Sequence, residues 1–145
     1  MSTTAAPVRE VQSRRDWPHA LLAVTGGTLV VVGSVLPWMS LFAGLHAYSG
    51  LAGSYGRLIF AGGALSVLGG AAMLARPRDW LRLGIGGVGV ALAVFAAWIL
   101  VGLSAKVREL GHHPLLLARP EPGVFVIIAG AIALAAVLLP VRRRI

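Results

Sequence analysis

LGIGGVGVALAVFAAWILVGLSA, residues 83–105, decides the fold class because its 23 residues include no Asp, Glu, Lys or Arg. A helix needs about 20 apolar residues to cross the hydrocarbon layer of a bilayer. Three further stretches lack these charged residues, at 20–43, 58–75 and 122–141. The sequence therefore predicts an all-α integral membrane protein, a bundle of four transmembrane helices.

The composition supports this prediction, since 57% of the 145 residues are hydrophobic and mean hydropathy is +0.84. A soluble domain of this length could not bury so much apolar surface. We expect a cytoplasmic segment at 1–18, one membrane domain at 19–141 and a basic cytoplasmic tail at 142–145. Within the domain we expect helices at about 19–42, 57–75, 81–105 and 122–141, outer loops at 43–56 and 106–121, and an inner loop at 76–80.

The net charge of +8 is explained by membrane topology rather than by a nucleic-acid partner. Nine arginines fall on the side of the two termini and four basic residues on the other, which predicts cytoplasmic termini in a bacterial plasma membrane. Arg142, Arg143 and Arg144 should attract anionic phospholipid at about 1 kcal/mol each. Twelve arginines to one lysine, with abundant Ala and Gly, suggest a GC-rich bacterial genome, such as that of an actinobacterium.

Arg-Asp-Trp occurs twice, at 15–17 and 78–80, just before the first and third charge-free stretches. Asp16 and Asp79 suit helix N-termini, and Pro18 suits a first turn. Faint similarity also links both helices of each pair, at shifts of 63 and 67 residues. We interpret this as two tandem hairpins related by an approximate two-fold axis along the membrane normal, and chance similarity between Ala- and Gly-rich helices is the alternative.

Small residues recur at every fourth position and predict close helix packing. The candidate packing residues are Gly62, Ser66, Gly70, Gly89, Ala93 and Ala97. Pro37 is expected to bend or end the first helix. Trp38, Tyr48, Tyr55 and Trp98 are expected in an outer aromatic belt. Trp38, Tyr48, Leu115, Leu116 and Leu117 are the candidate contacts with a partner or with lipid.

The residue types argue against catalysis, and we predict no catalytic residue, cofactor or metal. The chain contains no cysteine, which excludes thiolate chemistry. GIGGVG at 84–89 fits a dinucleotide-binding pattern but lies inside an expected membrane helix, where helix packing explains it better. The four histidines are interpreted as solvated residues, although His46, Glu109, His112 and His113 would form a metal site if the outer loops converged.

The charge-free helices carry no ionisable group of the kind that ion-coupled transporters keep inside the membrane. Their hydroxyl residues, Thr25, Thr28, Ser34 and Ser66, are expected to bond carbonyls one turn back.

LPWMSLFAG at 36–44, SGLAGSYGRLIFAGGAL at 49–65 and RPRDWLRL at 76–83 resemble the small four-pass membrane proteins common in actinobacteria. The resemblance covers most of the chain and implies a fold rather than an activity. It suggests an accessory subunit of a larger envelope assembly, such as a lipid importer, secretion apparatus or respiratory complex.

The sequence thus favours a non-enzymatic membrane subunit that packs against a larger membrane protein complex. A small transporter or channel for a neutral or apolar solute is the alternative. Because four helices leave little room for a pathway, that function would require a homo-oligomer. An enzyme using the outer histidines is the third interpretation.

Overall fold

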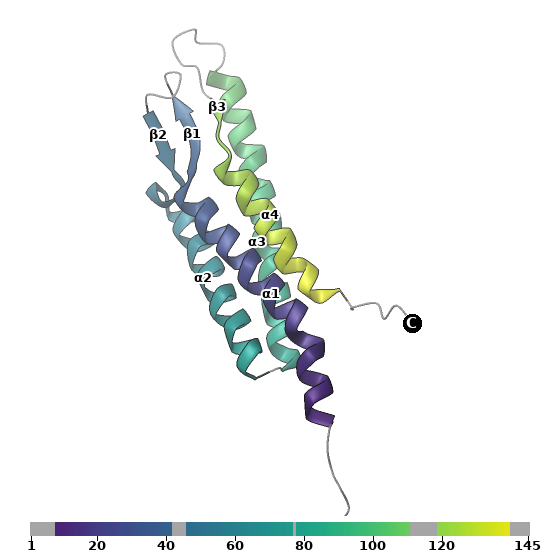
Figure 1. Ribbon diagram of the computed structural model, residues 1–145. Helices are drawn as coiled ribbons and strands as arrows, with labels where there is room; N and C mark the ends of the chain where they lie inside the picture. Colours follow the sequence, from purple (N-terminus) through teal and green to yellow (C-terminus); the bar gives the residue numbers. More distant parts are fainter. Residues whose placement is uncertain (1–7, 42–45, 77, 111–118, 140–145) are drawn as a thin grey trace, which may run out of the picture.

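The computed structural model describes residues 8–41, 46–76, 78–110 and 119–139. Four α-helices in these residues lie side by side, and a small sheet lies beyond the ends of α1 and α2, alongside α3 (Figure 1). α1 and α3 run toward the sheet, whereas α2 and α4 run away from it (Figure 1). The elements are α1 (Val8–Val35), β1 (Pro37–Leu41), β2 (His46–Ser49), the 3₁₀ turn η2 (Gly50–Ala52), α2 (Ser54–Ala75), α3 (Asp79–Leu110), β3 (Arg119–Pro120), α4 (Gly123–Ala135) and the 3₁₀ turn η3 (Ala136–Leu138).

Three of the helices are long and apolar enough to cross a membrane. The qualifying segments are Trp17–Val35, Ser54–Ala75 and Asp79–Lys106. Gly123–Leu138 is also apolar but shorter. At 1.5 Å per residue it extends about 24 Å, against about 30 Å for a typical hydrocarbon core. The chain is therefore a helical protein with the composition of a membrane protein.

The structure corrects the first helix at both ends. α1 ends at Val35 instead of continuing to residue 42, because Pro37 lacks an amide hydrogen and disfavours helical geometry in the residue before it. α1 also begins at Val8, within the segment expected to precede the membrane domain. Residues 8–16 are rich in Arg, Glu and Gln, which favour helix formation. Pro18 consequently lies inside the helix, and the prediction that it occupies a first turn is wrong.

A three-stranded antiparallel sheet has the order β2-β1-β3. β1 occupies the end of the expected first helix, and β2 and β3 lie in the two expected outer loops. Met39 of β1 pairs with Tyr48 of β2 on one side and with Pro120 of β3 on the other. The amide of Glu121 also bonds the carbonyl of Trp38 at 3.1 Å. The segments that leave α1, enter α2 and enter α4 are thereby held together. An all-α fold class omits this sheet.

α1 is the central helix and contacts α2 and α4 through glycines. A Cβ added to Gly26 would lie 2.9 Å from the carbonyl oxygen of Gly130, and one added to Gly27 would lie 2.9 Å from that of Gly63. Real Cβ atoms do not approach backbone so closely, so no larger residue fits these positions without a shift. Close backbone approach increases dispersion contacts between helices, which matters where lipid supplies no hydrophobic drive. The α1–α2 and α1–α4 pairs are therefore closely packed.

α3 packs mainly on α4 and only lightly on α2. An exact two-fold relation between the hairpins α1–α2 and α3–α4 would make the α2–α3 contact resemble the α1–α4 contact. Instead, glycines join α1 and α4 closely, whereas α2 and α3 diverge around a groove. Any duplication in the sequence has thus given rise to an asymmetric bundle.

Candidate functional site: a groove between α2 and α3

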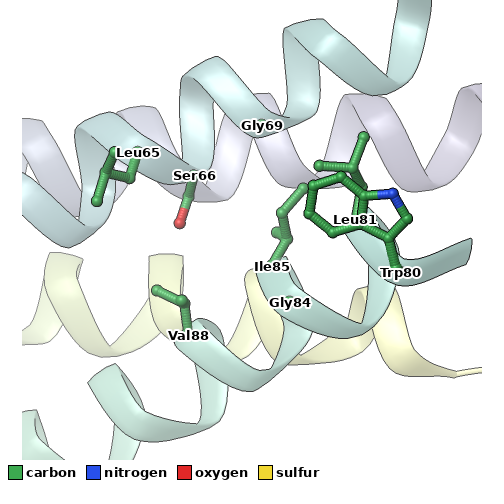
Figure 2. A pocket seen from close by; sticks show the side chains of 8 residues that line it. All are labelled: Leu65, Ser66, Gly69, Trp80, Leu81, Gly84, Ile85 and Val88. Atoms are coloured by element: carbon green, nitrogen blue, oxygen red, sulfur yellow. The ribbon is translucent and has the colours of Figure 1, made fainter. Parts of the chain in front are cut away.

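The groove between α2 and α3 is the candidate site. It has a volume of about 220 Å³. Figure 2 shows its lining, to which α2 contributes three residues and α3 contributes five. The lining residues are Leu65, Ser66, Gly69, Trp80, Leu81, Gly84, Ile85 and Val88. The absence of any charged side chain among them makes this a site for hydrocarbon rather than for a polar solute.

Ser66 contributes the only hydroxyl to the groove lining. Its Oγ donates a hydrogen bond to the carbonyl oxygen of Gly62, one turn back, at 2.8 Å. The other hydroxyls predicted to do this confirm the pattern: Thr25 bonds Leu21 at 2.8 Å, Thr28 bonds Val24 at 2.8 Å and Ser34 bonds Val30 at 2.7 Å. Because the Ser66 proton is already used, the indole N–H of Trp80 is the remaining side-chain donor among the lining residues.

The groove ends at the connection between α2 and α3. Arg76 directly follows α2 and Arg78 directly precedes α3, and both are exposed. The amide of Leu81, a lining residue, donates to the carbonyl of Arg78 at 3.1 Å. Two arginines therefore flank the connection that leads into Trp80 and Leu81, the first α3 residues of the lining.

Arg82 has a different role from its neighbours. Its Nε donates to the carbonyl of Val137 at 2.8 Å, and one terminal nitrogen donates to that of Leu139 at 2.7 Å. These carbonyls end η3, where backbone acceptors have no helical partner and the helix dipole favours a cation. Arg82 thus ties the start of α3 to the end of α4. From sequence, Arg82 is only one of the arginines that predict the cytoplasmic side, since nothing near it indicates a partner 55 residues away.

The candidate packing residues divide among several contacts. A Cβ on Gly62 would lie 3.3 Å from Leu92 of α3, and one on Gly70 would lie 2.9 Å from Ala23 of α1. Gly89 faces α4, with 2.6 Å from its Cβ position to the amide nitrogen of Ala135. Ala93 is half-buried against the core, whereas Ala97 is exposed. Other glycines at which α1 meets α2 and α4 lie outside the predicted rows of small residues at four-residue spacing. They include Gly26, Gly27, Gly63 and Gly130.

Trp38 lies inside the sheet end of the molecule rather than on an outward belt. Its Nε1 donates to the carbonyl of Gly33 at 3.0 Å, near the end of α1. Gly50 and Gly123 both face its indole, and a Cβ at either would clash with the ring. Its position is explained by internal packing. Tyr48, the other aromatic candidate for partner contact, is 48% exposed.

Tyr55, Phe95 and Trp98 form an aromatic cluster between the beginning of α2 and the middle of α3. Tyr55 meets Phe95 edge-on at 5.7 Å between ring centroids, and Phe95 stacks on Trp98 at 5.9 Å. Tyr55 and Trp98 are both more than half exposed. Such amphipathic rings suit the boundary between lipid and water.

The histidines do not assemble a site in the described ranges. His19 lies within α1 and is only 4% exposed, so its interpretation as a solvated residue is wrong. Among the side chains that the structure describes, no three His, Asp or Glu cluster as metal ligands would, and the His46 side chain lies outside that set. Glu109 pairs with Lys106 at 3.0 Å on the surface. His112, His113, Leu115, Leu116, Leu117, Arg142, Arg143 and Arg144 lie outside the described residues.

The glycines of the 84–89 pattern lie on different faces of α3. Gly86 faces Leu138 and Gly89 faces α4, so a Cβ at either position would clash. Gly84 lines the groove, and Gly87 faces outward; a Cβ at either would meet nothing within 4 Å. All of them lie inside a long helix, not in the strand-to-helix turn that a dinucleotide site requires.

Comparison with known proteins yields no match: no family model fits the chain, and neither a curated protein nor a solved structure is similar to it.

Proposed function

We propose that this chain is a non-enzymatic accessory subunit of a larger bacterial envelope assembly, such as a lipid-transport, secretion or respiratory complex. In this proposal all four helices cross the plasma membrane and both termini are cytoplasmic. The exposed face of α3 around Gly87 and Ala91 docks on a transmembrane helix of the partner. The two residues lie four apart, a spacing that lets a second helix approach closely.

The open glycine of this face is the observation that carries the proposal. A glycine inside a helix costs about 1 kcal/mol relative to alanine. A Cβ at Gly87 would meet nothing within 4 Å, so no contact in the described part of the chain requires this glycine. α3 is also the least buried long helix, with 17% of its apolar window buried against 44% for α1. Contact with another helix explains both the glycine and the exposure.

Crosslinking in native membranes tests the docking face. Because the chain has no cysteine, Ala91→Cys introduces a single thiol on this face, and Ala72→Cys places the matched control on an exposed position of α2. A thiol-attached photo-crosslinker at Ala91 should give one discrete product larger than the chain, and the control should give none. Gly87→Leu should abolish that product because the added side chain holds the helices apart. Equal products from Ala91 and Ala72, or none from either, would contradict the proposal.

The second candidate function is an oligomeric transporter or channel for a neutral or apolar solute. The apolar lining of the groove between α2 and α3 is the observation that favours it. A crosslinked product with twice the mass of the chain would support this function over the accessory role.

A further inference from the structure

We propose that the groove between α2 and α3 binds one anionic phospholipid, with an acyl chain along the groove and the phosphate beside Arg76 and Arg78. This inference requires the chain to lie in a membrane, but it does not depend on the accessory role or on which side of the membrane holds the termini.

The shape and chemistry of the groove suit an acyl chain. On α3 the lining runs from Trp80 to Val88, which corresponds to about 12 Å along the helix axis. This lining carries no charged side chain, and Ser66 has already given its proton to Gly62. Gly84 leaves open space on the α3 wall, where a Cβ would meet nothing within 4 Å, and Gly69 lies opposite on α2 (Figure 2). An extended hydrocarbon chain fills such a space without leaving a polar group unsatisfied.

The two arginines supply the recognition of charge. In the described residues neither the Arg76 nor the Arg78 side chain makes an ion pair or hydrogen bond, whereas Arg82 is occupied by the carbonyls of Val137 and Leu139. Asp79 is the acidic residue next to them. Arginine binds phosphate through paired N–H donors, and basic sites between helices at a membrane surface take anionic headgroups.

The two halves of the site belong to one ligand. An acyl chain gains little by leaving bulk lipid for an apolar groove, so the groove fixes position while the arginines provide selectivity. The exposed indole of Trp80, two residues after Arg78, lines the groove, and tryptophan is enriched where membrane helices meet headgroups. A second protein helix could fill the groove but would leave both arginines without an anion, which is why a lipid is the occupant that the charges favour.

Native mass spectrometry of the full chain, released from bilayers of equal phosphatidylglycerol and phosphatidylcholine, tests the site. The wild type should retain one phosphatidylglycerol in preference to phosphatidylcholine. Arg76→Gln and Arg78→Gln should each lower that preference about fivefold, the attraction expected of one arginine near an anionic headgroup. Gly84→Leu should remove the bound lipid, because its side chain enters open groove space without striking the protein.

Matched variants separate this site from general effects. Arg108→Gln removes an exposed arginine from the other end of α3, and Gly102→Leu makes the same addition as Gly84→Leu where a Cβ also meets nothing within 4 Å. Both should retain phosphatidylglycerol as the wild type does. Circular dichroism should give the same helix content for all variants. If Gly84→Leu loses helicity, the smaller substitution Gly84→Val replaces it.

Each other outcome overturns the proposal. Equal retention of the two lipids denies headgroup recognition. Loss of lipid with the arginine variants but not with Gly84→Leu indicates surface attraction without a groove site. Loss with Gly84→Leu alone indicates an occupant that carries no phosphate. A dimer that Gly84→Leu dissociates identifies a second copy as the occupant. None of these results bears on the Ala91 crosslink, so the lipid site and the accessory role succeed or fail separately.

Discussion

Single residues join elements that lie far apart in the sequence. Trp38 connects the end of α1 to the starts of η2 and α4. Its ring packs on Gly50 and Gly123, and its Nε1 donates a hydrogen bond to the carbonyl of Gly33. Arg82 does the same at the opposite end of the bundle by capping η3. At each end of the bundle one side chain thus donates a hydrogen bond to backbone carbonyls, whereas apolar contacts hold the middle.

Arg82 offers the sharpest prediction at this scale. Arg82→Gln should lower the free energy of unfolding by about 1 to 2 kcal/mol, because three backbone carbonyls lose a charged donor. Arg82→Lys should recover less than half of the loss, since an ammonium cannot reproduce the guanidinium fork. Unfolding in mixed detergent micelles, followed by circular dichroism, measures both. Arg108→Gln is the control, and a loss as large for Arg108 as for Arg82 would show that net charge, not capping, is responsible.

At the scale of elements, the two sides of the bundle differ in how closely helices approach. α1 meets α2 and α4 at glycines, whereas α2 and α3 separate around the groove. The close crossings provide rigidity, and the divergent pair provides a surface that lipid or another helix can enter.

Gly130 tests this division. Gly130→Ala should destabilise the protein by about 1 to 3 kcal/mol, because its Cβ would lie 2.7 Å from the carbonyl oxygen of Gly26 and α1 and α4 must move apart. Gly102→Ala, on an open face, should be neutral or slightly stabilising, since alanine favours the helix. Thermal unfolding of the two variants in the same detergent distinguishes them. Equal stability of the two would mean that α1 and α4 are not in glycine contact.

The positions of the helices could be predicted from sequence more readily than their contacts. Charge-free stretches locate the starts of α2, α3 and α4 to within about four residues, because lipid excludes charge from a helix. The ends differ more, since α3 continues to Leu110 beyond the expected 105 and α4 ends at Ala135 before the expected 141. The strands escaped prediction, since β1 and β3 are short and Met39 pairs with Pro120 across 80 intervening residues. The groove escaped as well, because its lining depends on how far α2 and α3 diverge. Small-residue spacing marks a face of a helix but not the helix that it meets.

For the whole molecule, the asymmetry between ends is the main feature. The sheet and the Trp38 contacts occupy one end, while α1 begins, α4 ends and the arginines of the α2–α3 connection lie at the other (Figure 1). This arrangement agrees with a membrane protein whose arginine-rich end faces the cytoplasm. The proposed lipid site lies at the same end.

The most direct test of the central claim is the labelling of single cysteines with a membrane-impermeant maleimide. Tyr48→Cys places a thiol at the sheet end, and Arg78→Cys places one at the opposite end, in a chain that has no other cysteine. In intact cells the Tyr48 position should be labelled at once, and the Arg78 position only after the membrane is permeabilised. Labelling of both positions from outside, or of Arg78 alone, would contradict the proposed crossing of the membrane.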